Sequence, residues 1–169
     1  MNYERLYKKA KNIIGDKTPL YKDCGKICDG ACCKGDEGTG MLLFPFEETT
    51  LRVTEKDGVR LAVCDGICNR NDRPLSCMIF PFFPYVTQEG RVKTVPDTRG
   101  FRVCPLVGNT DKVRLDRGFL MRVKKVGRLL SEDEECYRFL YETSREIDML
   151  NVLSPITIDK AENSGRIPL

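Results

Sequence analysis

The sequence predicts a small α+β fold, in which an irregular cysteine-rich body with short strands and a hairpin is flanked by one N-terminal helix and two C-terminal helices. Two observations lead to this prediction. Apolar residues recur with a period near 3.6 at both ends of the 169-residue chain. The middle of the chain has only short apolar runs between glycines and prolines, and it contains eight of the nine cysteines.

The N-terminal segment predicts an amphipathic helix over residues 2–14. Its apolar residues fall on one face of such a helix, and they are Tyr3, Leu6, Tyr7, Ala10, Ile13 and Ile14. Gly15 follows directly, and glycine is common just after the last turn of a helix. We therefore expect the helix to end at Gly15.

Short elements are expected in the middle of the chain. Residues 24–40 contain five glycines among cysteines and acidic residues, which predicts a loop. Met41–Phe44 and Val59–Cys64 are short apolar runs that favour strands. Tyr85–Val95 predicts a hairpin whose turn is Gln88–Arg91.

The acidic residues near the cysteines have structural interpretations. Pro45 predicts the start of a helix, with Glu47 and Glu48 in its first turn, where the helix dipole favours acidic side chains. We interpret these glutamates as helix-start residues rather than catalytic groups. Asp29 and Asp65 adjoin glycines inside the cysteine segments, where aspartate commonly forms turns.

The C-terminal part predicts two helices. In residues 116–130 one helical face carries Phe119, Leu120, Val123, Val126 and Leu130. Ser131 and Glu134 have the spacing of a capping box that would start a last helix over residues 132–151. We expect a single domain over 1–169, made of the helix in 1–15, the cysteine-rich body in 24–104, a helical pair in 112–151 and a tail in 152–169.

The composition excludes several classes of function. The chain has no histidine, so it has no Ser-His-Asp triad, no Cys-His protease pair and no histidine metal site. Its formal net charge of +3 is too small to predict nucleic acid or a membrane surface as a partner. No apolar run approaches the roughly 20 residues of a membrane span. The charged N-terminal segment lacks the pattern of a secretory signal, so we expect a cytoplasmic protein.

The cysteines are the strongest functional signal. Eight of them lie within 81 consecutive residues, and they are Cys24, Cys28, Cys32, Cys33, Cys64, Cys68, Cys77 and Cys104. Because thiols stay reduced inside cells, such clusters favour metal ligation over disulfides. In one continuous helix Cys24 and Cys32 would lie about 12 Å apart, too far for one ion with metal–sulfur bonds of about 2.3 Å. We therefore predict a loop that folds around metal. Cys136 lies in an amphipathic segment and is expected to pack in the core.

Ligand counting leaves the metal open between zinc and an iron–sulfur cluster. Eight thiolates suffice for two four-cysteine sites, or for one site with spare ligands. The chain has no Cys-x2-Cys, the usual zinc-ribbon spacing. Apolar residues flank Cys77, which favours an iron–sulfur cluster screened from water, with zinc as the alternative. Arg73 is predicted to neutralise the thiolates or an anionic cofactor, or else to be a solvated loop residue.

Three cysteine motifs follow one another in the body. Cys-x3-Cys-x-Gly-Ala-Cys-Cys at 24–33 precedes Cys-x3-Cys at 64–68 and then Arg-Pro-Leu-Ser-Cys-x-Ile-Phe-Pro-Phe from Arg73. Over residues 24–104 the chain resembles the YkgJ-like cysteine-cluster family of zinc- or iron-chelating domains, which has flagellin lysine N-methylases among its relatives. The resemblance implies that the motif cysteines are metal ligands, namely Cys24, Cys28, Cys32, Cys33, Cys64, Cys68 and Cys77.

Three functions are compatible with these features. We favour a metal-cluster protein whose metal is structural or transfers electrons. The resemblance also allows a cluster-dependent enzyme such as a protein lysine N-methyltransferase, although the sequence identifies no catalytic residue, and whether the protein is an enzyme stays open. The third is a zinc-held adaptor, because the basic segment 114–128 could bind an acidic partner protein. The alternative for that segment is a solvated face that pairs with the acidic residues at 132–135.

Overall fold

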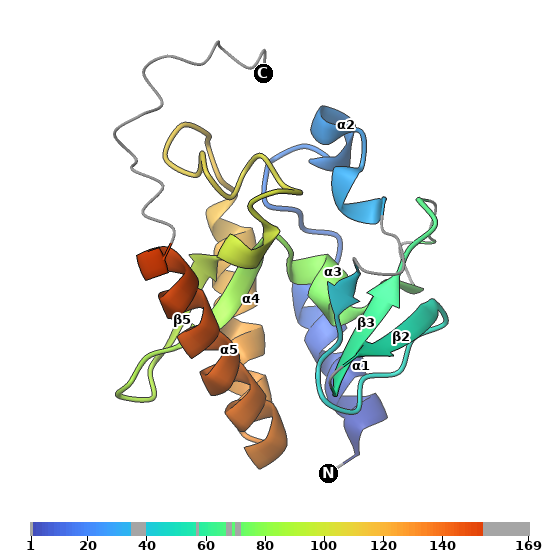
Figure 1. Ribbon diagram of the computed structural model, residues 1–169, viewed down its shortest axis with the longest axis vertical. Coiled ribbons are helices and arrows are strands. Elements are labelled where there is room, and N and C mark those ends of the chain that lie inside the picture. Colours follow the sequence, from blue (N-terminus) through green and yellow to red (C-terminus); the bar gives the residue numbers. More distant parts are fainter. Residues whose placement is uncertain (1, 35–39, 57, 67–68, 70–71, 154–169) are drawn as a thin grey trace.

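The computed structural model describes residues 2–34, 40–56, 58–66, 69 and 72–153. Its helices are α1 (Tyr3–Ile14), α2 (Gly25–Cys28), α3 (Leu75–Ile79), α4 (Arg117–Leu130) and α5 (Glu134–Leu153), with the 3₁₀ turns η1 (Ala31–Cys33) and η3 (Thr98–Gly100) (Figure 1). Its strands are β1 (Met41–Leu42), β2 (Arg52–Lys56), β3 (Val59–Val63), β4 (Phe82–Val86) and β5 (Val92–Pro96). Helices combined with small antiparallel sheets confirm the predicted α+β class.

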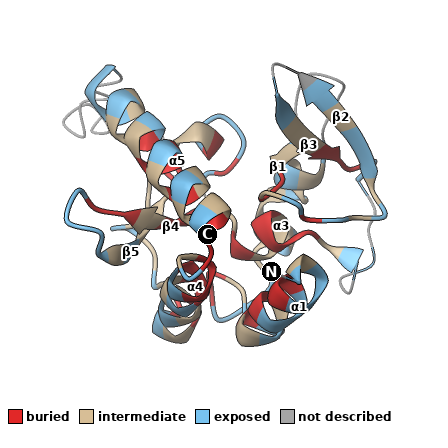
Figure 2. Cartoon of the chain, turned by 90° about the horizontal axis from the view of Figure 1, so that it is seen from below, coloured by how far each residue is buried: buried red, intermediate tan, exposed pale blue. Residues whose placement is uncertain are grey.

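The main core lies where α1, α4 and α5 pack around the β4–β5 hairpin and the short helix α3 (Figure 2). α1 buries Leu6, Ala10 and Ile14, which belong to the apolar face that the sequence predicts. α4 buries Phe119 and Val123 completely. Among the described residues, no helix combines the length and the apolar composition that crossing a bilayer requires.

The first two long helices begin and end close to the predicted positions. The side chain of Asn2 caps the start of α1, and Gly15 follows its last residue with a φ of 58°. α4 begins after Asp116, whose carboxylate accepts hydrogen bonds from the backbone N–H groups of Gly118 and Phe119. Both starts follow the usual preference for short polar side chains at the N-cap.

The predicted capping box of the last helix is wrong. Ser131 belongs to the end of α4, where its hydroxyl donates to the carbonyl of Gly127 at 2.8 Å. Asp133 caps α5 instead, because its carboxylate accepts the backbone N–H of Cys136 at 3.0 Å. The helix therefore begins at Glu134, two residues later than expected, because Ser131 is already engaged in the preceding helix.

The β4–β5 hairpin is confirmed. Its strands pair antiparallel as far as Val86 and Val92, next to the turn. In the turn the N–H of Thr87 donates to the carbonyl of Arg91 at 2.9 Å. Gly90 adopts a φ of 75°, a left-handed conformation that glycine takes without strain.

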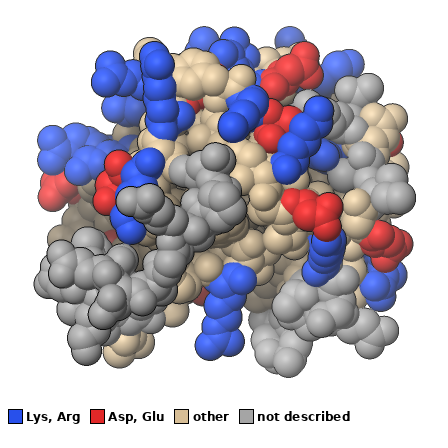
Figure 3. Space-filling view, turned by 90° about the horizontal axis from the view of Figure 1, so that it is seen from above, with Lys and Arg blue, Asp and Glu red and all other residues tan. Residues whose placement is uncertain are grey.

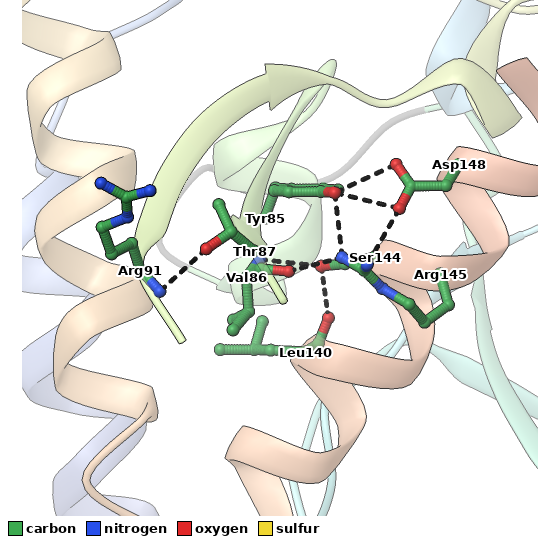
Figure 4. A network of polar contacts seen from close by, with 8 residues as sticks. All are labelled: Tyr85, Val86, Thr87, Arg91, Leu140, Ser144, Arg145 and Asp148. Atoms are coloured by element: carbon green, nitrogen blue, oxygen red, sulfur yellow. Dashed lines mark hydrogen bonds and ion pairs between the residues drawn. The ribbon is translucent and has the colours of Figure 1, made fainter. Parts of the chain in front are cut away.

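Side chains of α5 close the outer edge of β4 (Figure 4). The N–H of Val86 donates to the Ser144 hydroxyl at 2.9 Å, and the carbonyl of Val86 accepts from the Arg145 guanidinium at 2.7 Å. The Tyr85 hydroxyl donates to Asp148 at 3.0 Å and accepts from Arg145 at 2.9 Å. A bare strand edge leaves backbone groups unpaired. We infer that this polar network pairs them and holds the hairpin against α5.

A second, three-stranded antiparallel sheet has the order β1-β3-β2. The apolar runs predicted as strands correspond to β1 and β3. β2 was not predicted, because Arg52–Lys56 has a single aliphatic residue, Val53, among polar ones, and Val53 itself is exposed. β2 forms because it pairs with β3 along its whole length, and its own residues carry no apolar pattern.

The helix predicted to start at Pro45 is absent from this described segment, so the prediction is wrong. The chain makes a turn instead, in which the N–H of Glu47 donates to the carbonyl of Phe44 at 3.1 Å. Phe46 takes a φ of 58°, and this left-handed conformation cannot continue a right-handed helix. The phenyl ring of Phe46 stacks on the ring of Tyr3 at a centroid distance of 4.4 Å, so α1 helps to hold the turn.

Candidate metal site

The first cysteines lie on two short turns that a chain reversal separates. Cys24 is the N-cap of α2, and Cys28 is its last residue. Cys32 and Cys33 lie in η1. Between the turns Asp29 and Gly30 have φ values of 51° and 61°, so the helix stops after one turn. The sequence predicts a loop here, and the structure has two single helical turns instead. As expected, no continuous helix joins Cys24 to Cys32, and Asp29 lies in a turn.

Cys24 and Cys104 come together in a small second core. Its buried members are Leu20, Cys104, Leu106 and Val107, and Cys24 packs against them. The thiol of Cys28 lies 3.7 Å from the carbonyl oxygen of Cys24. Burial raises the pKa of Cys24, and negative charge on Cys28 and Cys104 raises it further. These three thiols therefore lie near enough to interact electrostatically.

Cys33 comes close to a cysteine from a different part of the chain. Lys34 and Asp65 pair as an antiparallel β-bridge, and the thiol of Cys33 interacts with that of Cys64 across these two segments. The pKa of Cys33 is raised mainly by its interaction with Cys32, whereas Cys64 and the positive charge of Arg73 lower it. Arg73 is thus near enough for its positive charge to favour the thiolate form of Cys33.

The two groups of thiols also interact with each other. The pKa of Cys32 is lowered mainly by its hydrogen bond with Cys33. Burial opposes this shift, and so does negative charge on Cys28, Cys24 and Cys104, the other group of thiols. Six of the eight predicted ligands are therefore linked by mutual interactions, and four of these six adjoin or belong to α2 and η1, at one end of the molecule (Figure 1). Within the described residues, no three potential ligands already converge on one ion-sized position.

Two further cysteines, Cys68 and Cys77, are also predicted ligands. Cys77 lies on α3 and is half-buried. Cys68 lies outside the described residues, so the structure does not describe its relation to the others. Cys136 is fully buried between helices and lies 3.5 Å from the Tyr7 hydroxyl, which confirms its predicted place in the core.

Glu47 supports the helix that carries Cys77. Its side chain is completely buried, and its carboxylate accepts the N–H of Leu75, the first residue of α3, at 2.6 Å. It also accepts the N–H of Phe44 at 3.4 Å and lies 3.6 Å from the Lys11 ammonium. Burial raises the pKa of Glu47, and these donors oppose that shift. Its interpretation as the start of a local helix is wrong, because the chain turns here and Glu47 instead accepts from the start of α3, 28 positions away. No local sequence pattern indicates that contact.

The surface at this end of the molecule carries charges of both signs. Figure 3 shows the molecule from the side of α2, where Lys and Arg side chains lie around much of the margin with acidic side chains between them. Lys34 and Asp29 form an exposed ion pair at 2.6 Å beside the cysteine turns. Positive charge near a thiol favours its ionised form, which is the form that binds metal, whereas burial and neighbouring thiols raise the pKa of Cys24, Cys33 and Cys104.

The donor set determines which metals the site suits. The predicted ligands that interact with one another are all thiols. Sulfur ligands suit zinc and iron–sulfur clusters, whereas magnesium and calcium take oxygen ligands. The residues therefore fit either of the two predicted groups. No protein-family model, no curated protein and no solved structure matches the chain at a significant level.

Proposed function

We propose that the protein binds metal through its clustered thiolates, as an iron–sulfur cluster or, alternatively, as zinc. The observation that carries the proposal is that thiols from three separate segments interact pairwise, because Cys33 is close enough to interact with Cys64 and Cys32 is close enough to interact with Cys104. Free cysteines that served only as small apolar residues would be expected inside the main core, as Cys136 is. The motif resemblance to zinc- or iron-chelating domains supports the same proposal.

The contacts suggest how the ligands divide. We assign Cys24, Cys28 and Cys104 to one ligand group, and Cys32, Cys33 and Cys64 to a second. Cys68 and Cys77 are the remaining candidates to complete four-cysteine sites. Arg73 would neutralise part of the negative charge of the second group, because its charge already favours the Cys33 thiolate.

We infer a structural or electron-transfer role for the bound metal in a reducing compartment such as the cytoplasm. Free thiols are found at Cys24, Cys28, Cys32, Cys33, Cys104 and Cys136. The metal would supply tetrahedral cross-links between turns as zinc, or a one-electron redox centre as an iron–sulfur cluster. The chain would contribute the thiolates, the left-handed reversal at Asp29 and Gly30, and the charge of Arg73.

The test is elemental and spectroscopic analysis of protein purified without oxygen. We expect stoichiometric iron with matching sulfide and a broad visible absorbance, or stoichiometric zinc in a colourless protein. The variants Cys33→Ala and Cys104→Ala should each lose metal, since each removes one member of an assigned group. Protein with neither iron nor zinc would overturn the proposal.

Cys136→Ala is the matched control, because it removes a thiol from the main core rather than from the candidate site. It should retain the full metal content and lose only stability. Loss of metal in this variant equal to the loss in Cys33→Ala would show that general destabilisation, rather than ligand removal, explains the result.

A further inference from the structure

Two helices from opposite ends of the chain bring their basic residues to one groove. α1 and α4 lie side by side at one edge of the molecule (Figure 2). The groove between them has a volume of about 560 Å³ and is lined by Arg5, Lys8, Lys9, Asn12, Ile13 and Lys125. We call it the α1–α4 groove. No acidic side chain is among these lining residues.

Charge is strongly segregated onto these two helices. Together they contain nine basic residues and one acidic residue, Glu4, although the net charge of the whole chain is only +3. Lys11 interacts with the buried carboxylate of Glu47, and Arg122 donates to the carbonyl of Ile14. Among the described residues, the four cations that line the groove form no ion pair.

The acidic residues after α4 do not neutralise its basic face, contrary to one expectation from the sequence. Glu135 pairs with Arg138 on its own helix, and Asp133 caps α5. In the described part of the chain, no ion pair joins residues 114–128 to residues 132–135. The positive charge of the groove is therefore available to a partner.

Apolar side chains in the groove and beside it narrow the choice of partner. Ile13 lies in the lining. Met121 lies outside the lining, one helical turn before Lys125 on α4, and is 73% exposed. No aromatic side chain lines the groove, whereas single-stranded nucleic acid is usually held by stacking on aromatic rings. Three of the four cations are lysines, which act as point charges rather than as bidentate forks for bases.

We propose that the α1–α4 groove binds an acidic segment of a partner protein that carries apolar residues between its carboxylates. The carboxylates contact Arg5, Lys8, Lys9 and Lys125, and the apolar side chains contact Ile13 and Met121. This surface is formed by the main core, so its binding does not depend on the proposed metal site. Docking of this kind is steered by charge and weakens as salt is added.

The test is a binding measurement by fluorescence anisotropy on the full chain, purified without oxygen. The probes are a labelled peptide with leucines between pairs of glutamates, poly-glutamate of equal charge, and single- and double-stranded DNA of equal charge. We expect the leucine-containing peptide to bind most tightly. The variant Lys8→Glu/Lys125→Glu should weaken its binding about tenfold or more, and Met121→Gln should weaken the leucine peptide but not poly-glutamate.

The matched control is Lys93→Glu/Lys112→Glu, which makes the same change in net charge at exposed lysines outside the groove. It should alter the affinity by less than about twofold, and thermal unfolding checks that both variants stay folded. Equal weakening by the two variants would overturn the proposal, because net charge alone would then explain binding. Tighter binding of DNA than of the peptide, or no binding of any probe, would also overturn it.

Discussion

Glu47 is a buried carboxylate whose hydrogen bonds link two distant parts of the chain. It accepts backbone N–H groups at Phe44 and at Leu75, the start of α3. Replacing it with alanine would leave these donors buried without an acceptor, which should lower the free energy of unfolding by about 2–3 kcal/mol. Chemical denaturation of Glu47→Ala measures this loss.

Glu47→Gln separates the hydrogen bonds from the charge. Glutamine keeps an acceptor oxygen at nearly the same size, and it removes the cost of burying a carboxylate, so its loss should stay below about 1 kcal/mol. A Gln variant as unstable as the Ala variant would show that the ion pair with Lys11, rather than the contact with Leu75, makes the main contribution.

Asp133 predicts a pH dependence of stability. The pKa of Asp133 is lowered mainly by the hydrogen bond from the N–H of Cys136, so the folded state favours the ionised carboxylate. Its contribution is present above the ordinary pKa of 3.8 and is lost as the pH falls through the lower folded value. Asp133→Ala should therefore lose about 1 kcal/mol near neutral pH, and the difference from wild type should shrink below about pH 3.

Urea unfolding of wild type and variant at both pH values checks this prediction. Because both proteins lose other carboxylate interactions in acid, only the difference between them reports on Asp133. Asp133→Asn is a further comparison, since asparagine also caps helices well but does not titrate. A difference between wild type and Asp133→Ala that stays constant with pH would contradict the assignment.

At the scale of elements, Gly127 sets how closely α4 approaches the hairpin. A Cβ atom at this position would lie 2.5 Å from Cβ of Pro84 and 2.7 Å from Cγ1 of Val92, closer than carbon atoms pack. Gly127→Ala should thus destabilise the protein by about 1–2 kcal/mol, although alanine is the better helix former. Thermal unfolding measures the change, with Arg128→Ala, at the exposed next position, as the control. A more stable Gly127→Ala would contradict the close packing.

The elements that the sequence predicts well are those with a long apolar period or a clear turn. α1 and α4 have several buried residues on one face, and the hairpin has its glycine turn, so tertiary contacts reinforce the local pattern. β2 and α3 are five residues each, too short for a period to be visible. β2 depends on pairing with β3, and the start of α3 depends on Glu47, so neither could be predicted from its own residues.

The same limit applies to the candidate site. Residue type identifies Cys33 and Cys64 as ligand candidates, but their proximity follows from the bridge between Lys34 and Asp65, which no local pattern indicates. Likewise, the sequence shows the basic residues of 114–128, but not that Lys8 and Lys9 from the other end of the chain lie opposite them. The sequence alone therefore predicts the types of residue at these two surfaces, but not the contacts between distant segments that bring them together.

At the scale of the whole molecule, the cysteine-bearing end and the main core are built differently. Helices α1, α4 and α5 share an extensive apolar core in which Cys136 is the only cysteine among the described buried members. The other end has a small core of four buried residues, one of which is Cys104. Under the proposed function, metal would organise the end that bears the clustered cysteines, and the apolar core would hold the other end.

Removing the metal should accordingly loosen one end of the molecule and leave the other intact. After chelation under anaerobic conditions, amide hydrogen exchange in residues 20–34 and 101–113 should accelerate about tenfold or more, because a small core holds little structure without its cross-links. Exchange in α4 and α5 should hardly change, because their buried apolar faces do not include the candidate ligands. Mass spectrometry of peptides from the two regions measures both in one experiment. Equal acceleration in α4 and α5 would contradict this division, because it would mean that the metal also stabilises the main core.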